Sequence, residues 1–313
     1  MNAATTLAAR IAVAPISWGV CEVPGWGWQL TPERVLADMR DLGVTATEFG
    51  PEGFLPADPA EKARTLSAYD LVAVGGFVPI VLHDAGLDPV PLIAAELEGF
   101  LAAGATRLVL SADTGQGGYD SRPTLTDAQW QTLLTNLDRI AEYAAGRDIV
   151  ASLHPHVGTL VESSADVSRV LAGSSIGLCL DTGHLLIGGT DPVDIAVRHA
   201  DRISHVHLKD VRVDLAHSVQ RGELSYTDAV RRGMYVPLGQ GDIDIATIVT
   251  SLEAADYTGY YVLEQDTILT AAPTAAEAPH LAVRSSIDFI LGLTPTTTTT
   301  TTTPVSNGGF TDA

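Results

Sequence analysis

The 313-residue chain has few basic residues, only two cysteines and no long hydrophobic run. Lysine and arginine number 18 against 38 aspartates and glutamates, so the formal net charge at pH 7 is −20. An acidic surface of this kind repels the phosphates of nucleic acids and of anionic lipids. No apolar run reaches the roughly 18 residues of a membrane-spanning helix. We therefore expect neither nucleic acid nor membrane as a partner.

Several targeting and cofactor motifs are also missing. The N-terminus has no basic start, apolar centre and small-residue cleavage site in order, so we expect a cytoplasmic protein. Cys21 and Cys179 form no CxxC pair or disulfide framework, which predicts reduced, packed thiols. A dinucleotide-binding sheet needs GxGxxG after its first strand, but the chain reads APISWGVCEVPGWGW there and has no Walker-type loop.

The composition divides the chain into one large domain and two tails. Apolar residues make up 46% of the sequence, enough for a sizeable core. The Thr-rich end has no apolar face and should be disordered. We therefore predict a flexible N-terminus at residues 1–10, a single catalytic domain at 11–293 and a disordered tail at 294–313.

Between the tails, strand-like and helix-like segments alternate, which predicts a parallel sheet because each crossover carries a helix. Eight such units fit a closed (β/α)8 TIM barrel, and a doubly wound open sheet is the alternative. A long irregular stretch precedes the last helix–strand–helix segment. The expected strands are residues 10–18, 44–50, 71–84, 105–113, 148–154, 175–181, 202–210 and 259–266. The expected helices are residues 31–43, 58–70, 88–104, 126–146, 164–173, 191–200, 244–255 and 277–292.

Histidines and carboxylates gather where these strands end, and TIM-barrel active sites lie at the C-terminal ends of the strands. Imidazole and carboxylate groups without a thiolate are the ligand set of a divalent metal such as Mn, Co, Fe, Zn or Mg. His205 lies on the same strand face as His207, whereas His199, His217 and His280 are expected to be ordinary surface or packing residues. The strand-end residues of this kind are His83, His154, His156, Asp181, His184, His207 and Glu264.

The stretch DTGHLL raises the question of why a buried strand ends in an acid and an imidazole. Asp181 is expected to be an anionic metal ligand, and His184 to orient it or to contact substrate. The alternative is that Asp181 caps the following helix. Asp191, in the segment DPV, looks like the better cap for the helix expected there.

Four motifs together resemble the xylose-isomerase-like TIM-barrel superfamily of sugar isomerases, epimerases and dehydratases. They are LCLDTGHLLIGG, HVHLKDVR, VPLGQGDIDI and VLEQD, and the likeness spans about residues 11–292. Within the superfamily, the segments GPEGFLP and GGFVPIVLHD favour the inosose dehydratase subgroup.

The resemblance implies one divalent metal, manganese or cobalt before magnesium, iron or zinc, held at the ends of strands five to eight. Asp181, His207 and Glu264 fall on ligand positions. Many relatives have a glutamate on strand five, where this chain has His154 with His156 beside it. His154 is the first choice as the fourth ligand, and His156 is the alternative.

The missing glutamate favours an elimination, because isomerases and epimerases of this type are expected to use two metal-bound glutamates on opposite faces of the substrate. The resemblance therefore implies a metal-dependent lyase that dehydrates a keto-cyclitol such as 2-keto-myo-inositol, or a related keto-sugar. The ion would polarise the ketone as a Lewis acid. Alternatives are a keto-sugar epimerase or isomerase and an inactive barrel that serves as a binding subunit, and a homo-oligomer is compatible with each.

Candidate groups for proton transfer lie on two sides of the expected barrel mouth. Lys209 follows His207 in HVHLKD and is expected at the rim as an acid, base or electrostatic group. A rim ion pair with Asp210 or a glutamate is an equally good interpretation of Lys209. Glu48 and His83 are weaker candidates for the proton acceptor.

Overall fold

The computed structural model describes residues 6–116, 122–276 and 278–293. The predicted disordered tail and the first five residues lie outside this range, so the predicted domain boundaries remain predictions. Residues Leu7–Arg10, within the expected flexible start, form the 3-10 helix η1, and the side chains of Leu7 and Arg10 are buried. Within the described residues, no helix is both long and apolar enough to cross a membrane.

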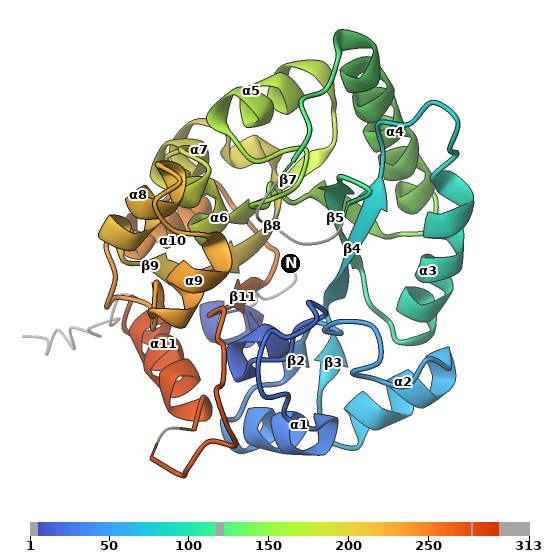
Figure 1. Cartoon of the computed structure of the whole chain (residues 1–313). Coiled ribbons are helices and arrows are strands. Elements are labelled where there is room, and N and C mark those ends of the chain that lie inside the picture. Colours follow the sequence, from blue (N-terminus) through green and yellow to red (C-terminus); the bar gives the residue numbers. More distant parts are fainter. Residues whose placement is uncertain (1–5, 117–121, 277, 294–313) are drawn as a thin grey trace, which may run out of the picture.

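The predicted TIM barrel is confirmed (Figure 1). Its parallel sheet runs in the order β3-β2-β1-β11-β8-β7-β6-β5-β4. Nine strands are present because the third barrel strand is divided at Val74, whose N–H donates to Thr47 while its carbonyl accepts from Arg107. Val74 thereby joins the two ends of the sheet. The strands are β1 (Ile11–Val13), β2 (Ala46–Thr47), β3 (Val72–Ala73), β4 (Gly75–Val81), β5 (Arg107–Asp113), β6 (Val150–Leu153), β7 (Gly177–Asp181), β8 (Ile203–Leu208) and β11 (Tyr261–Leu263).

The helices form the outer ring of the barrel, as Figure 1 shows. Several begin with the capping signals expected of their sequences: Thr126 and Ser163 each form a capping box, with Gln129 and Asp166. All eight predicted helices are present. They are α1 (Pro32–Asp41), α2 (Pro59–Ser67), α3 (Val90–Ala102), α4 (Asp127–Ala145), α5 (Ser164–Gly173), α7 (Pro192–Arg198), α10 (Ile245–Ala254) and α11 (His280–Gly292), with the 3-10 helices η2 (Pro15–Trp18) and η3 (Ala200–Arg202).

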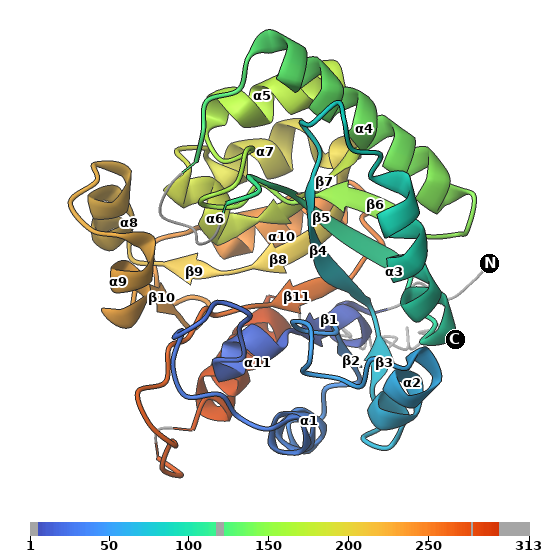
Figure 2. The ribbon, with the colours of Figure 1, turned by 45° about the vertical axis from the view of Figure 1, so that its right-hand side comes forward.

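The stretch predicted to be irregular is in fact structured, and this prediction is wrong. It forms an arm, defined here as residues 210–236, which projects beyond the end of β8 (Figure 2). Two short strands pair antiparallel at its base and two helices lie between them, each too short to give a clear hydrophobic period. The arm consists of β9 (Asp210–Val211), α8 (Val213–Gln220), α9 (Tyr226–Arg231) and β10 (Tyr235–Val236).

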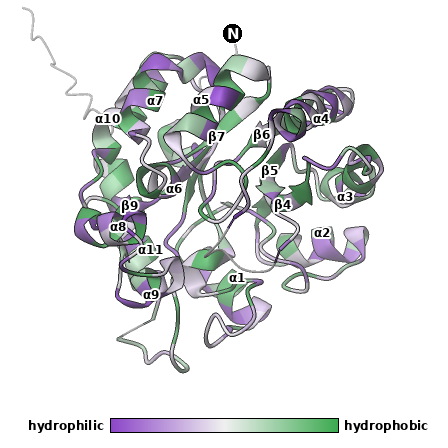
Figure 3. Cartoon of the chain, turned by 45° about the horizontal axis from the view of Figure 1, so that its top comes forward, coloured by the Kyte–Doolittle hydropathy of each residue, from purple (hydrophilic) through white to green (hydrophobic). Residues whose placement is uncertain are grey.

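The core lies between the sheet and the surrounding helices. Figure 3 shows mostly hydrophobic residues on β4 and β5, whereas the outer helices carry hydrophobic and hydrophilic residues on different sides. The buried apolar side chains include Trp18, Leu36 and Leu133. This division is typical of a barrel whose strands are covered on both faces, and it leaves the strand ends as the place for buried polar groups.

Candidate active site

The site is centred on Asp181, the last residue of β7, whose side chain is fully buried. Its Oδ1 accepts a hydrogen bond of 2.8 Å from the N–H of His184 and so caps the six-residue helix α6 (Thr182–Ile187). Its Oδ2 faces the cluster, 3.1 Å from His154 Nε2. Asp181 can therefore be both a helix cap and a metal ligand, because Oδ1 caps α6 while Oδ2 faces the cluster. Asp191 caps the next helix, α7, as expected.

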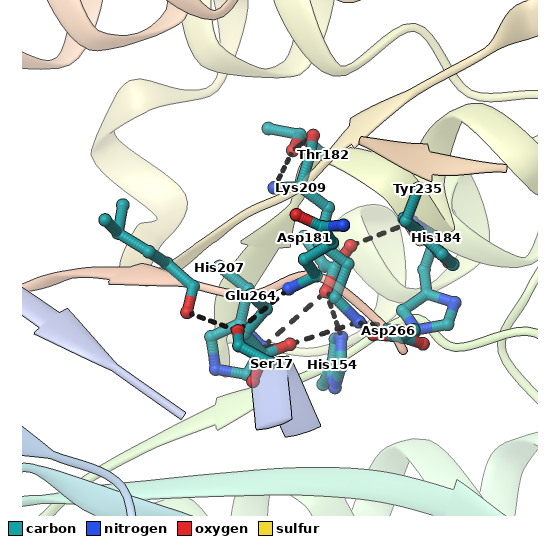
Figure 4. A network of polar contacts seen from close by, with 12 residues as sticks. Ser17, His154, Asp181, Thr182, His184, His207, Lys209, Tyr235, Glu264 and Asp266 are labelled. Atoms are coloured by element: carbon teal, nitrogen blue, oxygen red, sulfur yellow. Dashed lines mark hydrogen bonds and ion pairs between the residues drawn. The ribbon is translucent and has the colours of Figure 1, made fainter. Parts of the chain in front are cut away.

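Three of the predicted ligands from adjacent strands face one another (Figure 4). His207 Nδ1 lies 3.3 Å from Glu264 Oε2 and 3.6 Å from Asp181 Oδ2. One ligand atom from each of these residues lies within 4.8 Å of the other two. His207 Nδ1 is buried, and among the described residues it faces these two carboxylates without a hydrogen bond of good geometry. A divalent ion between the three side chains would satisfy all of them, and two carboxylates with an imidazole suit manganese, cobalt, iron, zinc or magnesium.

His154 and His156, two residues apart at the end of β6, occupy different surroundings. The His154 ring lies 4.9 Å from the His207 ring, and its Nε2 contacts Asp181. His156 instead packs against His184, with ring centroids 3.7 Å apart, and its Nδ1 donates to the Val157 carbonyl at 2.7 Å. The structure thus brings His154 to the three predicted ligands and places His156 beside them.

Lys209 lies inside the cluster, and its expected place at the rim is wrong. Its side chain is only 3% exposed. Its Nζ lies 2.8 Å from Asp266 Oδ1, 3.1 Å from Glu264 Oε2 and 3.4 Å from Asp181 Oδ2. It also lies 3.1 Å from His184 Nε2. His205, His207 and Lys209 follow one another at every second position, so they point to the same face of the strand. This spacing of two residues predicts that Lys209 points inward, as His207 does.

Lys209 does form the expected ion pair with a glutamate, Glu264, but not with Asp210. The Asp210 carboxylate accepts hydrogen bonds from the N–H groups of Gly239, Gly241 and Ile243, at 2.8–3.1 Å. A Cβ on Gly241 would come within 2.3 Å of the same carboxylate. The motif GQGD is therefore a loop folded around the buried Asp210.

The segment DTGH holds Lys209 in place. Thr182 Oγ1 donates to the Lys209 carbonyl at 2.5 Å and accepts from its N–H at 2.8 Å. A Cβ on Gly183 would lie 2.9 Å from Lys209 Cβ and 2.8 Å from the Tyr235 ring, so this position admits only glycine without movement. Asp181 and His184 contact the Lys209 ammonium from either end of the segment.

Sequence reasoning missed a second group of polar side chains on the other side of Lys209. Asp266 Oδ2 accepts a hydrogen bond of 2.5 Å from the hydroxyl of Tyr226, and the hydroxyls of Tyr226 and Tyr235 lie 3.1 Å apart. Both tyrosines come from the arm and carry no local sequence signal. Asp266 is two residues beyond Glu264 on the same strand face, so its inward direction could have been predicted.

Glu48, at the end of β2, lies beneath the predicted ligands. Its Oε1 is 2.7 Å from His205 Nε2 and 3.0 Å from His207 Nε2. All three side chains are buried. His83 lies elsewhere, in a cavity of about 390 Å³ with Asp84, Gln129 and Thr132. Among the described residues, no hydrogen bond or ion pair joins His83 to the cluster.

Burial and neighbouring charges set the protonation of the cluster. Burial lowers the pKa of His154 to about 4 and that of His156 to about 3. Burial would also lower the pKa of Lys209, but the carboxylates of Asp181, Asp266 and Glu264 raise it well above its ordinary value. At neutral pH, Lys209 is therefore an ammonium, and His154 is a neutral imidazole with a lone pair to donate.

A cavity of about 480 Å³ adjoins the cluster, a size typical of small-molecule sites. Its wall is formed by the loop after β6 and by the arm. Tyr226 is shared by the cavity wall and by the hydrogen bond to Asp266, which connects the cavity to Lys209. The lining includes Arg122, Val157, Gly158, Glu162, Ser225 and Tyr226.

Comparison with known proteins shows which proteins the chain is similar to. Residues 90–291 match the model of a family described as xylose isomerase-like TIM barrel. The chain is 35% identical to the rhizopine catabolism protein MocC of Rhizobium meliloti, covering 82% of this chain and 81% of that protein. It is 33% identical to an inosose dehydratase of Geobacillus kaustophilus, covering 82% and 87%. A solved L-ribulose 3-epimerase shares the fold, with a TM-score of 0.65 at 20% identity over 91% of this chain and 94% of that chain.

Proposed function

Because the chain belongs to the xylose isomerase-like TIM barrel family and is an enzyme of that superfamily, we propose that it is a metal-dependent dehydratase. The proposed substrate is a keto-cyclitol such as 2-keto-myo-inositol, or a related keto-sugar. Two observations support this choice. The inosose dehydratase relative is matched over most of its length, and the strand-five position that carries glutamate in many isomerases is His154 here.

The proposed metal site consists of Asp181, His207 and Glu264, with His154 as the fourth ligand in preference to His156. The convergence of His207 Nδ1 on the carboxylates of Asp181 and Glu264 and the contact between His154 and Asp181 support this set. Manganese or cobalt is the proposed ion. When bound, it would act as a Lewis acid on the substrate ketone.

Lys209 and His184 are the proposed proton-transfer pair. The observation that carries the proposal is that Lys209 Nζ lies 3.1 Å from both His184 Nε2 and Glu264 Oε2, so that the pair borders the proposed ligands. Burial and nearby imidazole and ammonium groups lower the pKa of His184 well below its ordinary value, so it is a neutral imidazole, the form in which a general base must stand before it accepts a proton. Lys209, as an ammonium, can donate one.

The elimination then balances within the site. His184 accepts the proton from the carbon next to the ketone, and the electron pair of that C–H bond forms the new double bond. The C–O bond at the next carbon breaks, and Lys209 donates a proton to the leaving hydroxyl, which departs as water. His184 can return its proton to the Lys209 amine across their 3.1 Å contact. Proton transfer by a positioned group typically contributes about 10²–10⁴-fold to a rate.

The competing function is a keto-sugar epimerase or isomerase that uses the same ligands. Two carboxylates on opposite faces of the substrate would serve it best. Epimerases of this type are expected to use two metal-bound glutamates, and among the proposed ligands Glu264 is the only glutamate, because His154 stands at the other position; Asp266 is paired with Lys209. This arrangement favours a single proton-transfer pair and hence the elimination.

The test is to load the purified enzyme with Mn²⁺ and incubate it with a panel of keto-cyclitols and keto-sugars. Dehydration removes one water from the mass and gives an enolisable dione that absorbs in the ultraviolet, whereas epimerisation preserves the mass. Mass-neutral turnover would replace the proposal by the competing one. The Asp181→Asn variant is the control for metal-independent water loss.

A further inference from the structure

The surroundings of the buried Glu48 carboxylate suit a role in positioning another side chain better than a role as proton acceptor. Glu48 is 4% exposed and lies below the proposed ligands. Its Oε1 lies within hydrogen-bond distance of two imidazole nitrogens, Nε2 of His205 and Nε2 of His207. A carboxylate oxygen only accepts, so both nitrogens donate their N–H to it.

The hydrogen bond from His207 fixes which of its ring nitrogens can hold a metal. Since Nε2 donates its N–H to Glu48, Nδ1 is the ring nitrogen left for a bond to a metal, which would take the place of a proton there. That atom is the one that faces Glu264 and Asp181, at 3.3 and 3.6 Å. Carboxylates that hold the far N–H of a metal-bound histidine orient the ring and increase its basicity.

His205 accounts for the second hydrogen bond to Glu48. Its side chain is fully buried, two residues before His207 on the same face of β8. His205 and His207 both donate to Oε1 of Glu48, and the hydrogen bond from His205 restrains the position of that carboxylate. A proton acceptor for the substrate would need an accessible oxygen, which this packing does not favour.

Resting on the proposed metal-dependent function, we propose that Glu48 is a positioning residue that, together with His205, presents Nδ1 of His207 to the metal. Glu48 therefore acts through His207, and it contacts neither the ion nor the substrate.

The first measurement is Mn²⁺ affinity, from the free-Mn²⁺ signal in electron paramagnetic resonance, for the wild type and for Glu48→Gln. Glutamine keeps the shape of the side chain but removes its charge, and loss of such a partner typically weakens metal affinity by about 10–100-fold. The matched control is Asp113→Asn, a change of the same charge at the end of β5, where, among the described residues, the carboxylate accepts a hydrogen bond from the N–H of Gly115. The control should bind Mn²⁺ as the wild type does.

The second measurement separates positioning from general packing. In the zinc-loaded wild type labelled with [¹⁵N]histidine, nitrogen–proton correlation spectra should show His207 bound through Nδ1, with a slowly exchanging proton on Nε2. In Glu48→Gln that proton should exchange faster. This spectrum of the wild type also tests the proposal if the variant does not fold.

Three outcomes are distinct. Zinc bound through Nε2 of His207, or equal Mn²⁺ affinity in folded Glu48→Gln and wild type, would overturn the role of Glu48 and leave the proposed function standing. A wild type that takes up no divalent ion would overturn both. The proposal is supported if Mn²⁺ binding is weaker in Glu48→Gln but not in Asp113→Asn, and if the wild type binds zinc through Nδ1 of His207.

Discussion

Replacing Lys209 by methionine separates its electrostatic role from its chemical one. In the metal-free enzyme, its ammonium lies within 3.4 Å of the carboxylates of Asp181, Glu264 and Asp266. At an effective dielectric constant of about 20, one such contact at 3.1 Å is roughly 5 kcal/mol of Coulomb attraction. Desolvation offsets much of that energy, but removing one partner of a buried pair still costs about 3–5 kcal/mol.

The expected loss of stability in metal-free Lys209→Met follows from that figure. A loss of 1 kcal/mol lowers Tm by about 2 °C in a domain at the upper end of the usual size range, so Tm should fall by roughly 6–10 °C. A divalent ion bound by Asp181 and Glu264 replaces part of the lost positive charge. Added Mn²⁺ should therefore raise the Tm of the variant by more than that of the wild type.

The expected loss of activity is independent of stability. Methionine cannot donate a proton, so kcat for water loss under saturating Mn²⁺ should fall by about 10²–10⁴-fold. The assay follows dione absorbance and product mass. The matched control is Lys62→Met, because Lys62 is the only other lysine in the chain and its Nζ lies over the Phe49 ring on the outer side of the barrel. A kcat within a few-fold of wild type, with metal bound, would refute the role of Lys209 in the chemical step.

Three further changes are predicted. Asp181→Asn should abolish tight Mn²⁺ binding in a titration while keeping the cap of α6, whereas Asp181→Ala should lose about 1 kcal/mol more in thermal unfolding; full occupancy in either variant would contradict the ligand assignment. Gly183→Ala should lower the free energy of unfolding by about 1–3 kcal/mol through overpacking. It should also lower kcat more than Mn²⁺ affinity, because the added Cβ contacts Lys209. Unchanged kinetics would show that displacing the lysine has no effect. Partial burial opposes ionisation of Asp138, but hydrogen bonds from two serines outweigh it and lower its pKa. Its stabilising contribution is therefore present at neutral pH and lost as the pH falls below about 4, so Asp138→Asn should flatten the dependence of Tm on pH in that range, and an unchanged slope would contradict it.

The barrel could be predicted because its signal is local and repeated. Each apolar strand is followed by an amphipathic helix with ordinary start and stop residues, and the alternation itself implies parallel pairing. The same alternation located the ligand candidates, since Asp181, His207 and Glu264 each stand where an apolar run ends. These positions follow from the chain order and need no knowledge of tertiary contacts.

The contents of the site were less predictable, and for two physical reasons. Lys209 and Asp266 point inward because the two-residue alternation of side-chain direction continues past His207 and Glu264. The sequence does not show how many residues beyond the end of a strand keep this alternation. Tyr226 reaches the site through the arm, whose helices are too short for a hydrophobic period to be recognised. The packing of Glu48 against two histidines of β8 is a long-range contact across the barrel, which local sequence does not encode.

The arm has a consequence for how specificity can diversify on this scaffold. Its strands β9 and β10 pair with each other and with no strand of the barrel sheet. Helices α8 and α9 can therefore change together without breaking a ladder hydrogen bond of the barrel sheet. Such a change would leave Asp181 and His207 in place, but it would replace Tyr226, which forms part of the cavity wall and holds Asp266, the partner of Lys209. The arm therefore ties the shape of the cavity to the surroundings of Lys209.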